Sequence, residues 1–177
     1  MKDRRLLDHQ KYSECQLVAV VNAAAYLGEP LVDPDSEEYE RLIDLVGARH
    51  GSAISIRLAV NYLRLRCHEI EPLSLENVKE FTLSGKPVSV SIRHPDPGLH
   101  QVLLTDGDSA AVRAWNLRIK DCPDGRLTWP RLGELMAAVA PHLRKAEWYE
   151  LDPMKVRKKD GEGGGDHAVR STSSLRR

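Results

Sequence analysis

Residues 87–93, Pro-Val-Ser-Val-Ser-Ile-Arg, alternate apolar and polar side chains with a period of two, which is typical of a half-buried strand. Residues 100–105, His-Gln-Val-Leu-Leu-Thr, predict a second strand. The Asp106-Gly107-Asp108 sequence favours a turn, and residues 110–116 then resume an extended pattern. We therefore expect these three runs to form an antiparallel meander.

The residues on either side of this meander have mostly helical patterns. Residues 15–27 are almost wholly apolar up to Gly28, which predicts a helix that is buried on most sides. Apolar residues at helical spacing predict further helices over 36–46, 55–65, 75–83 and 129–139. Residues 145–151 predict a closing strand. Helices followed by a mostly antiparallel sheet predict an α+β fold rather than a doubly wound one.

The length and charge of the chain limit its organisation and partners. Its 177 residues are enough for one ordinary domain, and 26 basic residues balance 26 acidic ones. Such a balance gives no general attraction for polyanions, so we expect neither nucleic acid nor a membrane as partner. The sequence predicts a folded domain over residues 1–152 and a disordered tail over 153–177, which is rich in basic residues, glycine and serine.

The termini and cysteines indicate a cytoplasmic protein. The first ten residues lack the apolar segment of a secretory signal, and the longest apolar run is too short to cross a bilayer. Cys15, Cys67 and Cys122 are an odd number without C-x-x-C spacing, which argues against a disulfide framework and a zinc knuckle. We therefore expect no metal and no cofactor. The sequence leaves the oligomeric state open.

Four residues form a candidate catalytic set. Cys15 lies at the predicted start of a helix, where free N–H groups and the helix dipole lower the pKa of a thiol. His100 begins a predicted strand and is a candidate general base. Asn116 is expected near the same end of the hairpin, where an asparagine carbonyl would orient the imidazole. Gln10 precedes Cys15 and is a candidate oxyanion donor, together with the Cys15 backbone N–H.

These residues resemble a known family. Residues 10–23, 85–92 and 100–105, followed by Trp115-Asn116, resemble the papain-like cysteine peptidases, and most closely the bacterial branch typified by the leader-cleaving peptidase domains of bacteriocin exporters. The resemblance covers residues 8–150. It implies a papain-like fold, with N-terminal helices on a mostly antiparallel sheet. It also implies that Cys15 is the nucleophile and His100 the base, with Asn116 as the orienting residue and Gln10 as the oxyanion donor.

The chain departs from the family pattern at four points. Gln16 stands where the family has glycine, and its side chain would narrow the cleft beside the thiol. Gln10 is one residue closer to Cys15 than the family places it, and His9 occupies the usual spacing. The exporter branch mostly has Asp at the position of Asn116, although papain itself has Asn. The resemblance covers no exporter segment, so it does not imply a leader-peptide substrate.

We predict a cysteine peptidase that hydrolyses a peptide or isopeptide amide through a thioester, with a peptide or protein as substrate. Deamidation or acyl transfer would use the same residues. The alternative from another class is an idle papain-like fold that binds protein, and a third is a structural metal site.

Other residues offer rival roles. His94 is a rival base, and Asp106 and Asp108 are alternative orienting residues, although Asp-Gly-Asp between strands is typical of a turn. Cys67 and His68 are neighbours on an extended segment, so they are expected to point to opposite faces and to form no dyad. Cys122 is expected in a loop.

Overall fold

The computed structural model describes residues 7–8, 14–50, 55–95 and 98–155, and within them the chain has an α+β fold. All strand pairs in its six-stranded sheet are antiparallel, and the strand order is β1-β6-β2-β3-β4-β5. The strands are β1 (Leu65–Glu69), β2 (Val88–Arg93), β3 (Leu99–Thr105), β4 (Ala111–Trp115), β5 (Arg126–Thr128) and β6 (Ala146–Leu151). The α helices are α1 (Cys15–Tyr26), α2 (Glu37–Val46), α3 (Ile56–Tyr62), α4 (Leu75–Leu83) and α5 (Trp129–Ala137), with short 3-10 helices at Ala48–His50 and Pro141–Leu143.

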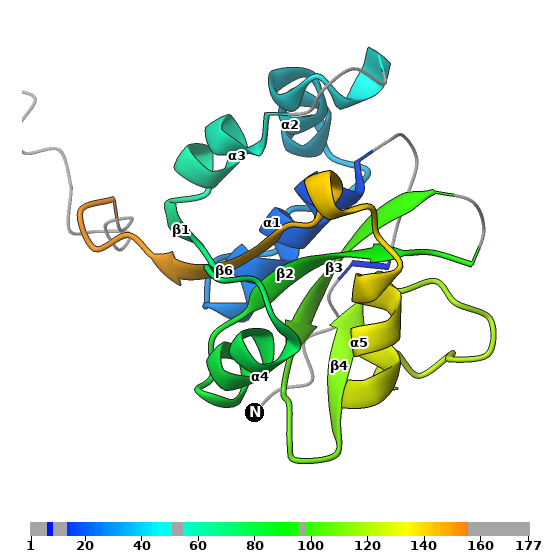
Figure 1. Cartoon of the computed structure of the whole chain (residues 1–177). Helices are drawn as coiled ribbons and strands as arrows, with labels where there is room; N and C mark the ends of the chain where they lie inside the picture. Colours follow the sequence, from blue (N-terminus) through cyan, green and yellow to red (C-terminus); the bar gives the residue numbers. More distant parts are fainter. Residues whose placement is uncertain (1–6, 9–13, 51–54, 96–97, 156–177) are drawn as a thin grey trace, which may run out of the picture.

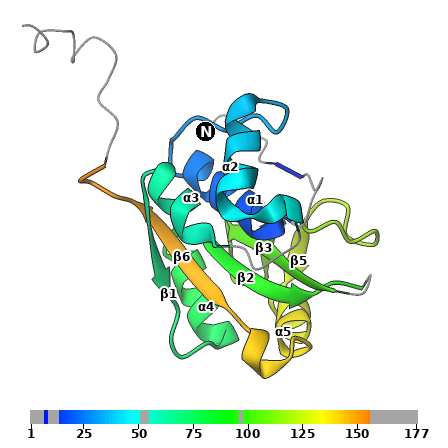
Figure 2. The ribbon, with the colours of Figure 1, turned by 90° about the horizontal axis from the view of Figure 1, so that it is seen from above.

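The sheet lies between two layers of helices (Figure 1). Helices α1, α2 and α3 cover one face, and α4 and α5 cover the other, as the view from above also shows (Figure 2). Neighbouring residues of β3 divide between the two cores: Leu103 packs with α1–α3, whereas Val102 and Leu104 pack on the opposite side. This division follows from the alternation of side chains along a strand.

Helix α1 is the buried centre of its layer. Nine of its twelve residues are buried, and the helix packs directly against β3. Gly28, with φ +113°, follows its last turn in a conformation that L side chains rarely adopt. Because α1 is apolar nearly all round, it has to lie between the sheet and α2–α3, and this position brings its first residue to the sheet.

The α+β class, the meander and the helices predicted around it are confirmed, with two corrections. The helix predicted over 55–65 ends at Tyr62, and the chain then enters β1, which pairs with β6 along its whole length. The extended segment expected at Cys67 and His68 is part of β1, whereas β5 was not predicted, because its three residues are too few for a period to show. Strand β1 forms through pairing with the distant β6, and β5 through pairing with β4, the strand directly before it.

The disordered tail was predicted over residues 153–177. Of these, 156–177 lie outside the described residues. None of the helices in the part of the chain that the structure describes is both long and apolar enough to span a bilayer.

Candidate active site

Cys15 is the first residue of α1, and the helix carries its thiol to β3. The side chain is half-buried, and hydrogen bonds from the backbone of Gln101, of Gln16 and of Cys15 itself reach the sulfur. Gln101 follows His100 directly in β3. The structure therefore brings Cys15 to the strand start that carries the predicted base, although the two residues are 85 positions apart in the sequence.

Burial raises the pKa of the Cys15 thiol above its ordinary 9.0. The three backbone hydrogen bonds act in the opposite direction, and the nearby charge of Glu14 adds to the increase. The lowered pKa expected from the helix start is thus wrong for this structure, because removal of the sulfur from water outweighs the N–H groups around it. At neutral pH the resting group is a thiol.

His100 is 5% exposed and is held by a backbone carbonyl. Its Nε2 lies 2.6 Å from the carbonyl oxygen of Asn116. A carbonyl oxygen can only accept, so Nε2 carries the proton and Nδ1 keeps its lone pair. Burial lowers the pKa of His100 below 6.5, despite the opposing effect of the Asn116 carbonyl. The imidazole is therefore neutral at physiological pH.

Asn116 lies beside His100, as expected, but it does so through its main chain. The side-chain Oδ1 and Nδ2 are buried, and neither has a hydrogen-bond partner among the described residues. The residue is 4% exposed and has φ +63°, which turns the chain at the end of β4. This left-handed conformation, which asparagine tolerates better than most residues, points the carbonyl at His100. The family role of the side chain as orienting group has no hydrogen bond to support it here.

His94, the rival base, is next to His100. The two rings meet edge to face with centroids 5.3 Å apart. His94 Nε2 donates to the carbonyl of Arg118 at 2.8 Å, and Arg118 also has a positive φ, of 58°. The carbonyls of Asn116 and Arg118 therefore hold the two imidazoles. The backbone that hydrogen-bonds to the Cys15 sulfur is that of Gln101, which follows His100 and not His94.

The oxyanion donors predicted from the sequence are the side chain of Gln10 and the backbone N–H of Cys15. Gln10, like His9 at the alternative spacing, lies outside the described residues. The N–H groups of the first turn of α1 remain candidate donors, because those groups have no carbonyl partner within a helix. Glu14, the N-cap residue, makes no side-chain capping bond to them.

Two neighbours of the thiol were not singled out in the sequence. Glu14 is fully buried, and its carboxylate accepts a hydrogen bond from Tyr39 at 3.0 Å. The side chain of Gln101 donates to Ser89 at 3.2 Å. In the sequence, Glu14 and Gln101 are only polar residues at the edge of an apolar run. Such residues are usually exposed, so the pattern did not indicate that these two lie beside the thiol.

The remaining sequence candidates lie away from this centre. Asp106 and Asp108 follow the far end of β3, and Asp108 accepts the N–H groups of Ala110 and Ala111, as in a turn. Cys122 is in a loop, where its thiol donates to the carbonyl of Arg126. Their predicted turn and loop positions are confirmed.

Cys67 and His68 do point to opposite faces of β1. Cys67 packs with the α1–α3 core, whereas His68 stacks on Trp148, which packs with the other core. Among the described residues, no three His, Cys, Asp or Glu side chains are grouped to hold a metal ion. A comparison of the sequence with protein-family models and with curated proteins finds no match to either.

Proposed function

We propose that the protein is a cysteine-dependent amide hydrolase of the papain-like type, in which Cys15 is the nucleophile and His100 the base. The observation that carries the proposal is the meeting of α1 and β3. It places the thiol of Cys15 on the backbone of the residue that follows His100. A peptide or isopeptide bond is the proposed substrate.

The directions of the two pKa shifts define the first step. Cys15 rests as a thiol and His100 as a neutral imidazole, so the proton passes to Nδ1 as sulfur attacks the carbonyl carbon. The imidazolium that forms is stabilised by the carbonyl of Asn116 at Nε2. No preformed thiolate is required.

The later steps follow from the same groups. When the tetrahedral intermediate collapses, the C–N bond breaks and His100 gives its proton to the leaving amine. The acyl group remains on Cys15 as a thioester. Water then attacks the thioester with His100 as base, which releases the acid and restores the thiol. N–H groups at the start of α1, with Gln10 as the proposed side-chain donor, would stabilise the oxyanion in both halves.

The test is acylation of the full chain by p-nitrophenyl acetate at neutral pH, with the acetylated cysteine located by peptide mass spectrometry. We expect acetyl transfer to Cys15, with a burst of nitrophenol. His100→Ala should slow the burst by about 100-fold or more, the usual contribution of a general base. Cys15→Ser should abolish the burst. Hydrolysis of labelled casein by the same preparations then tests the peptide substrate.

Matched controls separate chemistry from folding. Cys122→Ser alters another thiol, and His142→Ala alters an exposed histidine of the 3-10 helix Pro141–Leu143. Both should react like the unmodified chain. If Cys15 is acetylated no faster than Cys122, the proposal is wrong. The raised pKa of Cys15 would then favour the alternative, an idle fold that binds protein.

A further inference from the structure

A second group of reactive side chains lies at the other end of the sheet, beside an open pocket. The pocket has a volume of about 690 Å³ and lies between α3 and the strands β1 and β6. Cys67, Lys145 and Glu147 are among its lining residues. None of them belongs to the candidate active site described above, which lies at β3 and β4.

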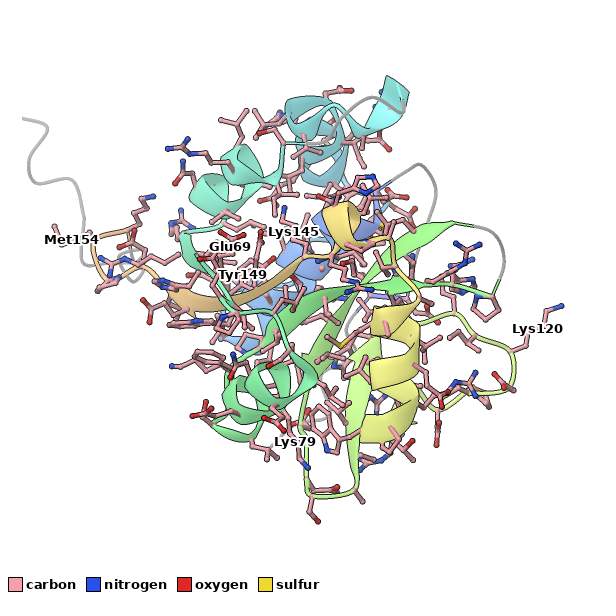
Figure 3. All side chains as sticks on the ribbon, viewed as in Figure 1. Glu69, Lys79, Lys120, Lys145, Tyr149 and Met154 are labelled. Carbon is pink, nitrogen blue, oxygen red and sulfur yellow. The ribbon has the colours of Figure 1, made fainter. Side chains whose placement is uncertain are left out.

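These three residues form one hydrogen-bonded group. The Cys67 thiol donates to Glu147 Oε2 at 2.9 Å, and Lys145 Nζ lies 3.1 Å from Glu147 Oε1. Glu147 is 7% exposed, and it also accepts the hydroxyl of Tyr149 at 3.3 Å. Figure 3 labels Lys145, which directly precedes β6, and Tyr149, which belongs to it. The group thus combines a nucleophile, an acceptor for its proton and a positive charge.

The contact with Glu147 determines how this thiol can react. Burial, and then the hydrogen bond and charge of Glu147, raise the pKa of Cys67 far above its ordinary value. Free thiolate is therefore scarce at neutral pH. A carboxylate that already accepts the S–H hydrogen bond can instead take the proton during attack, as a general base does.

The charges around the pocket indicate which ligand it would take. Four of its described lining residues are cationic, Arg57, Arg66, Lys145 and Lys155, and two are anionic, Glu147 and Asp152. The two carboxylates are already engaged by cations: Glu147 by Lys145, and Asp152 by Arg66 and Lys155. Arg66 also lies 3.8 Å from Glu150 Oε1, and the positive charge that remains, with Arg57 among its sources, favours a small anion beside the thiol.

We propose that this pocket is a second reactive-thiol site, which binds a small organic anion bearing an acyl group and transfers that acyl group to Cys67. In the step, sulfur forms a bond to the acyl carbon and Glu147 takes the thiol proton. The bond from the acyl carbon to the leaving group then breaks. The leaving group receives the proton from Glu147, and the product is an S-acyl cysteine.

The first test compares two alkylating probes that differ in charge, iodoacetate and iodoacetamide. Peptide mass spectrometry of the full chain follows each cysteine separately. At Cys67 the rate ratio of iodoacetate to iodoacetamide should exceed the ratio at Cys122 by about tenfold or more, since local positive charge concentrates anions. Cys122 is a matched control because burial, and then the charges of Asp124 and Asp121, raise the pKa of its thiol, and these charges would repel the anion. An equal or lower ratio at Cys67 would overturn the anion site.

The second test asks what Glu147 does. Glu147→Gln retains a hydrogen-bond acceptor but is a far weaker base. If Glu147 is the base, this change slows alkylation of Cys67 by about 100-fold. If Glu147 only suppresses the thiolate, the substitution lowers the pKa of Cys67 and speeds the reaction, which would overturn the proposal. Unchanged alkylation of Cys122 shows that the variant remains folded around that loop.

A third variant keeps the proposal testable should Glu147→Gln fail to fold. Lys145→Gln removes one cation of the pocket, and its side chain is about 40% exposed. It should lower the preference of Cys67 for iodoacetate and leave the ratio at Cys122 unchanged. A preference that survives this change would exclude Lys145 from the site.

Discussion

At His100 the orienting group is a main-chain carbonyl rather than the amide side chain that the family pattern implies. This matters for mutagenesis, because a substitution at position 116 keeps the backbone carbonyl in place as long as the backbone conformation is unchanged. Asn116 has φ +63°, so the conformation depends on how well the new residue tolerates the left-handed region. Glycine adopts it freely, and alanine does so at a cost of about 1 kcal/mol.

Replacement of Asn116 should therefore reveal the role of the carbonyl. Asn116→Gly retains the left-handed turn, so we expect acetylation of Cys15 to fall less than about tenfold, against about 100-fold for His100→Ala. In Asn116→Ala, acetylation of Cys15 should fall further than in Asn116→Gly. The alanine variant should also lower the free energy of unfolding by about 1 kcal/mol more than the glycine variant does. The measurements are the acetylation burst and urea denaturation. A loss in Asn116→Gly equal to that of His100→Ala would assign the orienting role to the side chain.

The pKa directions at Cys15 and His100 predict a particular pH profile for alkylation of Cys15 by iodoacetamide. His100 must be neutral to accept the proton, so the rate should fall as the pH drops through its pKa, which lies below 6.5. Above that pKa the rate should be flat until thiolate forms, above pH 9.0. His100→Ala should show only the alkaline rise. A wild-type rate with no neutral plateau would mean that His100 is not the base.

At the scale of elements, a buried hydrogen bond joins the start of α1 to α2. Glu14 precedes Cys15 and is fully buried, and Tyr39 of α2 donates to its carboxylate. A buried carboxylate needs such donors to offset its loss of hydration. The position of Cys15, the proposed nucleophile, thus depends on a contact between two helices.

Tyr39→Phe removes this donor and leaves the ring in place. We expect the free energy of unfolding to fall by about 2 kcal/mol, the usual cost of a lost hydrogen bond to a charged group. Tyr62→Phe is the matched control, because the Tyr62 hydroxyl also donates to a carboxylate, that of Glu38, but at the surface. Its effect should stay within about 0.5 kcal/mol. Equal losses for the two variants in urea denaturation would contradict the proposed importance of burial.

Across the whole molecule, two cores lie on opposite faces of one sheet, and a row of polar groups crosses the sheet between the two candidate sites. Gln101 donates to Ser89, which bonds to Tyr149, which donates to Glu147. These residues come from β3, β2 and β6 in turn. The row links the strand that meets Cys15 to the pocket at Cys67 through hydrogen bonds between neighbouring strands and, from Tyr149 to Glu147, within β6.

The apolar residues of both cores lie within residues 7–151 of the described chain. A chain that ends at Lys155 should therefore keep its midpoint of thermal unfolding within about 3 °C, roughly the shift that 1 kcal/mol causes at this size. A chain that ends at Lys145 lacks β6, which pairs with both β1 and β2, and should not fold cooperatively. Calorimetry of the two chains tests this. A large drop in the midpoint of thermal unfolding of the chain that ends at Lys155 would mean that residues beyond Lys155 stabilise the fold.

From the sequence alone, the local elements and the α+β class could be predicted, because a period of two or 3.6 residues records which side chains each segment buries. The periods could not show where β1 begins, because its partner β6 is distant, or show β5, because it has only three residues. Nor could they show the path of the Asn116 carbonyl to His100, the hydrogen bond from Gln101 to Cys15, or the contact of Cys67 with Glu147. The pKa of Cys15 illustrates the reason: a helix start lowers it by local geometry, but burial by distant segments raises it, and burial exists only in the folded chain.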